Sequence, residues 1–190
     1  ISANFGNMFS LAGASVILPF LPQLPSQVLL INILTDAPTL SIASDDVDPE
    51  MLEEPRKWDI QLIRKFMIVF GLISSIFDFL TFGFLYWICH LSESGFRTGW
   101  FIESVLTEIL ILLIIRTHRT WIKSRVGRAL LWSSVISMAI VLLIPYLPLM
   151  QHLGFEPLPW HILLAIIGIA FVYGMFGEIT KKILFRKMRY

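Results

Sequence analysis

The sequence predicts an all-α membrane protein, a bundle of about six transmembrane helices. Hydrophobic residues make up 56% of the 190 residues and charged residues only 15%, whereas about a quarter of the residues in a soluble domain are charged. The mean hydropathy is +0.74. The apolar residues also gather into stretches close to the roughly 20 residues that a helix needs to cross a bilayer. We therefore expect the lipid bilayer to surround this chain.

The charged residues and the single cysteine exclude several other classes of protein. The net charge is only +1, so the composition gives no basic surface for a nucleic-acid partner. Cys89 is the one cysteine, which excludes a disulfide framework and a cysteine metal cluster. The four histidines fall at segment ends or in loops, and none forms a helical metal-binding pair.

Six apolar stretches define the predicted spans, and together they form one transmembrane cation-transport domain over residues 1–190. Their approximate bounds are 1–18, 24–43, 66–88, 99–115, 129–147 and 160–178. The first stretch begins inside an apolar run at Ile1, so we interpret it as a truncated span and the chain as a fragment of a longer one. Pro19, Pro22 and Pro25 predict a turn between the first two spans, because proline ends helices.

The second span is expected to be broken near Pro38. Proline has no N–H for the carbonyl of Leu34, and its ring pushes against that carbonyl. Broken helices at membrane depth are tolerated where they line a cavity, and transporters use them as ion sites. We therefore expect free backbone oxygens beside Asp36.

The basic residues predict the orientation in the membrane. With residues 44–65 on the cytoplasmic side, 14 of the 15 Lys and Arg residues lie in cytoplasmic segments, and only Arg97 lies outside. The cytoplasmic set is Arg56, Lys57, Arg64, Lys65, Arg116, Arg119, Lys123, Arg125, Arg128, Lys181, Lys182, Arg186, Lys187 and Arg189. The positive-inside rule then predicts a cytoplasmic C-terminus. We expect the plasma (inner) membrane as the location.

Three acidic residues lie near predicted span centres: Asp36, Asp78 and Glu108. A carboxylate at the centre of a span costs about 2.5–3.5 kcal/mol on insertion scales, so each of them calls for a functional or structural reason. Glu103 is placed closer to the outer end of its span. Glu178, beside two lysines, is interpreted as a structural residue at the cytoplasmic face.

The polar residues around Asp36 predict a cation site. Asn32, Thr35 and Asp36 are spaced to share one helix face, and they supply an amide, a hydroxyl and a carboxylate oxygen. Such hard donors suit Mg²⁺, Ca²⁺ or alkali ions. Asn4 and Asn7 share a face of the first span, where Gly6 allows a close helix approach, and they can join the same site.

Other polar and aromatic residues leave alternatives open. Glu108, beside Thr107 and one turn after Ser104, is either a ligand or a partner in interhelical hydrogen bonding. Asp78 can be a ligand, a proton site or a packing anchor. Aromatic residues at segment ends predict an interfacial belt; they are Trp87, Trp100, Trp121, Tyr146 and Trp160.

Several motifs together carry a family resemblance. They are Ser2-Ala-Asn4-Phe-Gly-Asn7, Asn32-Ile-Leu-Thr35-Asp36, Asp48 with 54–56, and the stretches 64–78, 99–104, 115–117 and 154–159. In combination they resemble the fifth to tenth membrane helices of type II and III P-type ATPases, and are closest to the magnesium-transporting branch. The resemblance covers essentially the whole chain.

The resemblance implies a set of metal ligands. In that family, polar residues of the fourth, fifth, sixth and eighth helices coordinate the transported cation. The resemblance thus implies Asn4 and Asn7 on the fifth helix, Asn32, Thr35 and Asp36 on the sixth, and Glu108 on the eighth. Mg²⁺ is implied as the transported ion and, with ATP, as a ligand of cytoplasmic domains outside this sequence. Thr35 and Glu108 depart from the magnesium pattern, which keeps Ca²⁺ and monovalent cations as alternatives.

The sequence contains no Asp-Lys-Thr-Gly phosphorylation motif and no nucleotide-binding domain. We therefore expect catalysis of ATP hydrolysis in cytoplasmic domains of the same protein, which with its first membrane helices are the expected partners. An ATP-independent carrier or channel subunit with Asp36, Asp78 and Glu108 as a relay is one alternative. A structural fragment in which Asp36 binds nothing is another.

Overall fold

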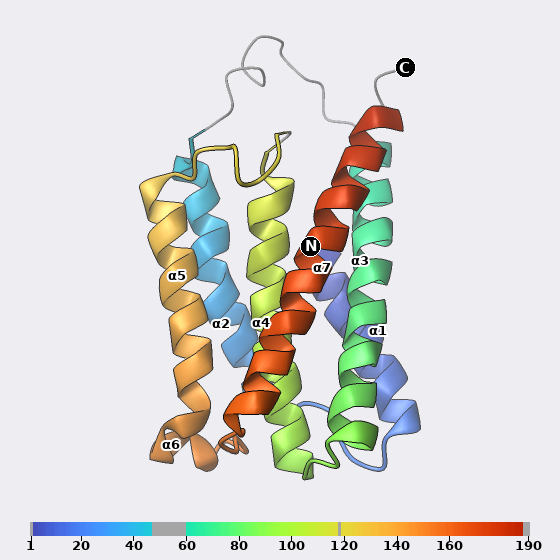
Figure 1. The fold of residues 1–190 in the computed structure, drawn as a ribbon, viewed down its shortest axis with the longest axis vertical. Coiled ribbons are helices and arrows are strands. Elements are labelled where there is room, and N and C mark those ends of the chain that lie inside the picture. The colour runs from blue at the N-terminus through green and yellow to red at the C-terminus, as the bar shows by residue number, and fades with distance from the viewer. Residues whose placement is uncertain (1, 47–59, 118, 188–190) are drawn as a thin grey trace.

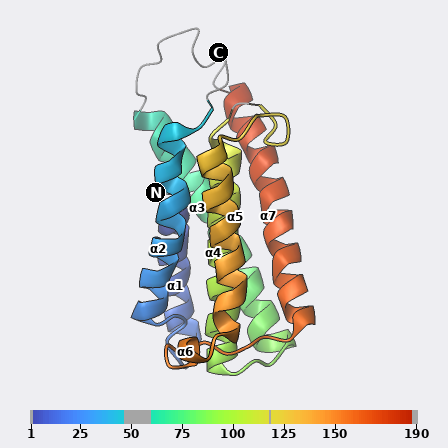
Figure 2. The same cartoon turned by 90° about the vertical axis from the view of Figure 1, so that its left-hand side faces the viewer.

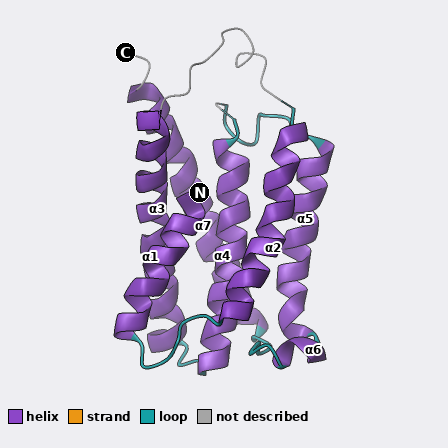
Figure 3. Cartoon of the chain, turned by 180° about the vertical axis from the view of Figure 1, so that it is seen from behind, coloured by secondary structure: helices purple, strands orange, loops and turns teal. Residues whose placement is uncertain are grey.

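A computed structural model of the chain describes residues 2–46, 60–117 and 119–187. Every regular element within these ranges is a helix (Figure 3). The α-helices are α1 (Ser2–Ile17), α2 (Pro25–Ser41), α3 (Ile60–Gly83), α4 (Glu93–Ile115), α5 (Arg128–Leu143), the short α6 (Pro148–Gln151) and α7 (Trp160–Lys187). Three short turns extend them: η1 (Ile42–Ser44), the π-helical η3 (Phe84–Ile88) and η4 (Ile144–Tyr146). The described residues thus contain a helix for each of the six predicted spans.

Part of the sequence prediction falls outside the described residues. Asp48 and the stretch 54–56 of the family resemblance lie there, as do the predicted cytoplasmic residues Arg56, Lys57 and Arg189.

Four of the helical segments are long and apolar enough to cross a membrane. They are Ile63–Ile88, Glu93–Ile115, Arg128–Tyr146 and Trp160–Arg186. The helices α1 and α2 have 16 and 17 residues, somewhat fewer than the roughly 20 of a typical span. The all-α membrane bundle predicted from the sequence is therefore confirmed.

The helix α4 stands at the centre of the bundle. In Figure 1 the helices α2 and α5 lie on one side of it and α3 and α7 on the other, and Figure 2 shows the same bundle from the side. The helix α1 packs along α3, α2 packs along α5 and α4, and α7 packs along α4. The side chains of Phe101, Ile102 and Val105 are fully buried in the core around α4.

Three helices begin or end outside their predicted bounds. The helix α4 begins at Glu93 rather than residue 99, because the Ser92 hydroxyl caps it by accepting a hydrogen bond from the Gly95 N–H at 2.9 Å. The helix α3 begins at Ile60 rather than residue 66, and α7 continues to Lys187 rather than residue 178. Hydropathy detects only the apolar part of a helix, so polar turns at the ends were missed.

The predicted break of the second span is wrong, although its physical basis is correct. The helix α2 runs through Pro38 to Ser41. The carbonyl of Leu34, which Pro38 leaves without its usual helical donor, accepts a hydrogen bond from the Ser137 hydroxyl of α5 at 2.7 Å. A hydroxyl on the neighbouring helix thus satisfies the freed oxygen, and no break follows.

Glycine brings α1 into close contact with another helix, as predicted for Gly6, and that helix is α3, which the sequence did not identify. A Cβ at Gly6 would lie 2.8 Å from the Cβ of Ser74, and one at Gly13 would lie 2.7 Å from Cζ of Phe79. The Ser75 hydroxyl donates to the Gly6 carbonyl at 3.2 Å. Small residues therefore set the distance between these helices, as is common in membranes.

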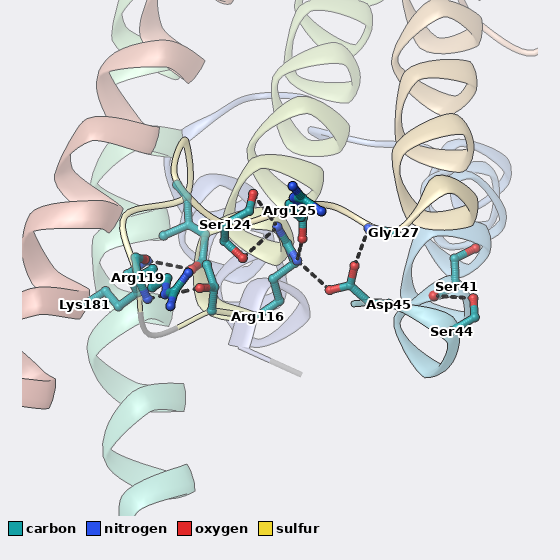
Figure 4. A network of polar contacts seen from close by, with 11 residues as sticks. Ser41, Ser44, Asp45, Arg116, Arg119, Ser124, Arg125, Gly127 and Lys181 are labelled. Carbon is teal, nitrogen blue, oxygen red and sulfur yellow. Dashed lines mark hydrogen bonds and ion pairs between the residues drawn. The ribbon is translucent and has the colours of Figure 1, made fainter. Parts of the chain in front are cut away.

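One end of the bundle gathers the ends of α2, α4 and α7 and the start of α5 into a polar network (Figure 4). Arg116, after α4, donates to Asp45 at 2.6 Å and to the Arg125 carbonyl at 3.0 Å, and Asp45 accepts from the Gly127 N–H at 2.7 Å. The buried Lys181 of α7 donates to the Ile114 carbonyl at 2.9 Å. These bonds satisfy helix-end groups that otherwise have no partner.

Candidate cation site

The polar face of α2 is divided between the bundle interior and its surface. Thr35 is buried, and its hydroxyl donates to the Ile31 carbonyl at 3.1 Å. Asn32 and Asp36, one turn apart, are exposed on a face that the described residues leave uncovered. The three residues are therefore neighbours on one helix, but Thr35 faces inward and the other two face outward.

Glu108 of α4 completes this cluster from the centre of the bundle. Its half-buried carboxylate lies beside the Thr35 hydroxyl and within electrostatic range of Asp36. The Oε2 atom of Glu108 is buried and has no hydrogen-bond partner among the described residues. Leaving a buried carboxylate oxygen unsatisfied costs free energy, so this atom is a candidate ligand for a cation.

Asn4 and Asn7 occupy the start of α1, where Asn4 is exposed and Asn7 half-buried. Their helix packs on α3 and more lightly on α4. Within the described part of the chain, no hydrogen bond joins either asparagine to α2 or α4. The structure thus brings together Thr35, Asp36 and Glu108, and it leaves the asparagines on a separate helix.

The cluster combines two acidic side chains with two neutral oxygen donors. Among the described residues, no three His, Cys, Asp or Glu side chains converge. Asp36 and Glu108 supply two carboxylates, and Thr35 and Asn32 supply neutral donors. Mg²⁺ is typically bound through one or two carboxylates and keeps several water molecules, so this chemistry suits a partly hydrated divalent cation.

The chain matches a known family over residues 20–183, described as the C-terminus of cation-transporting ATPases. This chain is a C-terminal membrane region of that family. The match covers the described helices from α2 to most of α7.

Curated relatives of this C-terminal region are magnesium-transporting ATPases of P-type 1. The protein from Salmonella typhimurium is 37% identical over 185 residues, which is 95% of this chain and 20% of the relative. The protein from Escherichia coli K12 is 40% identical over 163 residues, or 83% of this chain and 18% of the relative. The chain therefore spans about a fifth of the length of these relatives.

The same ATPase region contains a second acidic centre that the sequence analysis did not assemble. Asp78 of α3 and Glu103 of α4 are both 1% exposed and hydrogen-bonded to each other. Trp100, predicted in an interfacial belt, is fully buried and donates its indole N–H to Asp78 at 3.1 Å. The belt assignment of Trp100 is wrong, because α4 begins at Glu93 and the Trp100 side chain is fully buried within the bundle. Glu103 lies near the middle of α4 rather than close to its start.

A helical-spacing argument on α4 could have found part of this second centre. Trp100 and Glu103 are three residues apart and so share a face of α4. Whether that face meets Asp78 depends on how α3 and α4 are rotated about their axes. Local sequence patterns do not predict this rotation.

Proposed function

We propose that this chain is the membrane half of an ATP-driven cation pump, one transport domain over residues 1–190, and that its cargo is Mg²⁺. The names of the relatives support Mg²⁺ over Ca²⁺ or a monovalent ion. ATP hydrolysis, with its own Mg²⁺, belongs to cytoplasmic domains of the same protein, and further membrane helices accompany this bundle. Both lie outside the sequence described here.

The observation that carries this proposal is that Glu108, at the centre of the bundle, lies within electrostatic range of Asp36 on an uncovered face. Asp36 is exposed there, and the Oε2 atom of Glu108 is buried without a described partner. A charged group inside a membrane normally faces a partner or a cavity. In this proposal the cation and the helices beyond this sequence supply that partner.

The proposed ligands come from two parts of the bundle, the contact of α2 with α4 and the start of α1. Asp36 and Glu108 contribute charge, and Thr35 and Asn32 contribute neutral oxygens from the same helix turn. Asn4 and Asn7 reach the cation from α1 after that helix moves toward α4 during transport. Such motion is a shift between two packed states, driven by phosphorylation in the cytoplasmic domains.

The orientation follows from the basic end of the bundle. Described basic residues at the ends of α4 and α7 and at the starts of α3 and α5 lie at the same end, and Arg97 lies at the opposite end. The positive-inside rule supports a cytoplasmic location for the basic end and for the C-terminus. In a bacterial cell this corresponds to the plasma membrane.

The test uses the full-length pump in sealed vesicles, with Asp36→Asn and, as the matched control, Glu93→Gln. Glu93 is an exposed acid at the start of α4, where it pairs with Arg97 of the same helix at 3.0 Å, away from Glu108. We expect ATP-dependent Mg²⁺ uptake to fall at least about a hundredfold in Asp36→Asn. The substitution removes the negative charge that holds the bound cation, and hydrogen bonds and contacts to a charged group are stronger than those to a neutral amide. The control is expected to transport normally. Mg²⁺ uptake that does not require ATP would support the alternative of an ATP-independent carrier. Uptake that stays at the wild-type rate in Asp36→Asn would contradict the proposed site.

A further inference from the structure

The acidic centre formed by Asp78 and Glu103 is enclosed by four helices. Asp78 comes from α3 and Glu103 from α4, and α1 contributes Ser10, which is fully buried. The helix α7 contributes Tyr173, whose buried side chain lies near Ser74. Unlike the Asp36 cluster, this centre has no exposed member.

Asp78 acts only as a hydrogen-bond acceptor. The Ser10 hydroxyl donates to Oδ2 of Asp78 at 2.5 Å, and the Trp100 indole N–H donates to Oδ1 at 3.1 Å. An indole nitrogen has no acceptor capacity, so Oδ1 must accept. This donor arrangement fits an ionised Asp78.

Glu103 contacts the same carboxylate. Two carboxyl groups can share a hydrogen bond only if one of them carries a proton, since ionised carboxylates are acceptors only. Asp78 already accepts from two donors, so the proton belongs to Glu103. The Oε2 atom of Glu103 is buried and has no partner among the described residues, which fits a neutral acid better than a carboxylate.

The surrounding charges agree with a single proton. Among the described residues, no Lys, Arg or His forms an ion pair with Asp78 or Glu103. The titratable group that α7 presents to the pair is Tyr173, which Glu108 of α4 also influences, and α1 presents the Ser10 hydroxyl. None of these supplies a positive charge. Two adjacent buried carboxylates cannot both ionise without such a charge.

We propose that Asp78 and Glu103 form a proton-binding site inside the membrane, in which Glu103 holds one proton and donates it in a hydrogen bond to Asp78. This inference goes beyond cation transport and does not depend on the identity of the cargo. The proton keeps the pair at one negative charge. Loss of the proton places two like charges in contact and separates α3 from α4.

Ser10 connects this proton site to α1. It lies one turn after Asn7 and donates to the carboxylate that accepts the Glu103 proton. Movement of α1 removes the Ser10 donor from Asp78. The Asp78 carboxylate then attracts the proton of Glu103 more strongly. The position of α1 and the proton are therefore linked, and each biases the other.

Infrared spectroscopy of the full-length pump tests this site through the carbonyl stretch of protonated carboxylic acids. The wild-type pump is expected to show this band at neutral pH, and Glu103→Gln is expected to lose one component of it. The matched control Glu93→Gln is expected to retain the wild-type band. An unchanged band in Glu103→Gln, or no protonated-acid band in the wild type, overturns the proposal.

A second variant keeps the test sharp if Glu103→Gln does not fold. Ser10→Ala removes one donor to Asp78 and strengthens its attraction for the proton, so it is expected to shift the frequency of the same band. A band that stays at its wild-type frequency in Ser10→Ala overturns the link to α1.

Discussion

The bundle contains two acidic centres with opposite surroundings. At Asp78 and Glu103, hydroxyl and indole donors converge in a fully buried interior. At Asp36 and Glu108, one acid is exposed and the other has a buried oxygen without a described partner. Both centres consist of two acids on adjacent helices. Each centre also has a glutamate whose Oε2 atom is buried without a described partner. The difference teaches that an acid within a span is a ligand candidate where its centre reaches an uncovered face, as at Asp36, and a structural or proton-holding group where donors enclose it, as at Asp78.

The largest effect expected from this comparison is on stability. Asp78→Ala leaves the Ser10 hydroxyl, the Trp100 N–H and the Glu103 proton without an acceptor, so we expect a loss of about 3–5 kcal/mol, as for other broken buried charged networks. Asp36→Ala, at an exposed position, is expected to change stability by less than about 0.5 kcal/mol. Thermal unfolding of the full-length pump measures both. Equal losses in the two variants would remove the distinction.

A smaller loss of stability is expected at the basic end of the bundle, where Asp45 pairs with a cationic side chain. The Arg116 side chain is 2% exposed and pairs with Asp45 at 2.6 Å. Asp45→Asn leaves that guanidinium without its anion, and we expect a loss of about 1.5–3 kcal/mol, the range for hydrogen bonds to charged groups. The exposed neighbour Asp46 provides the control Asp46→Asn. Equal unfolding temperatures for the two variants would show that the ion pair stabilises nothing.

The smallest effect is expected at Pro38, where no charge is involved. Ser137→Ala removes the hydroxyl that donates to the Leu34 carbonyl, and we expect a loss of about 1 kcal/mol, the usual net value of a neutral hydrogen bond. Ser133→Ala on the same helix, whose hydroxyl bonds within α5, serves as control. If Pro38→Ala restores the stability of Ser137→Ala, the carbonyl has regained its helical donor; no restoration would contradict this account.

The sequence predicts the helices well because hydropathy is a local property. Each of the six predicted spans has its helix, and Gly6 allows a close helix approach as expected, although the sequence did not identify α3 as the neighbour. The ends of α4 and α7 were missed where polar residues continue the helix beyond the apolar stretch. The break at Pro38 was wrong because the compensating Ser137 lies 103 residues away in the chain.

The candidate site was only partly predictable for a related reason. The spacing of Asn32, Thr35 and Asp36 identifies their helix turn, yet it does not say that Thr35 points inward. Glu108 becomes a member of this cluster through the packing of α4 against α2, and Glu103 becomes a partner of Asp78 through its packing against α3. Five residues separate the two glutamates, so the rotation of α4 decides which centre each one joins.

The central claim is that Glu108, with Asp36, binds the transported cation. The most direct measurement is the apparent Mg²⁺ affinity of the full-length pump in Glu108→Gln and in Glu93→Gln, which make the same chemical change on the same helix. We predict that Glu108→Gln weakens the affinity at least about tenfold, because a charged contact contributes about 1.5–3 kcal/mol and about 1.4 kcal/mol corresponds to tenfold. Glu93→Gln is predicted to retain the wild-type affinity. Wild-type Mg²⁺ affinity in Glu108→Gln would contradict the account.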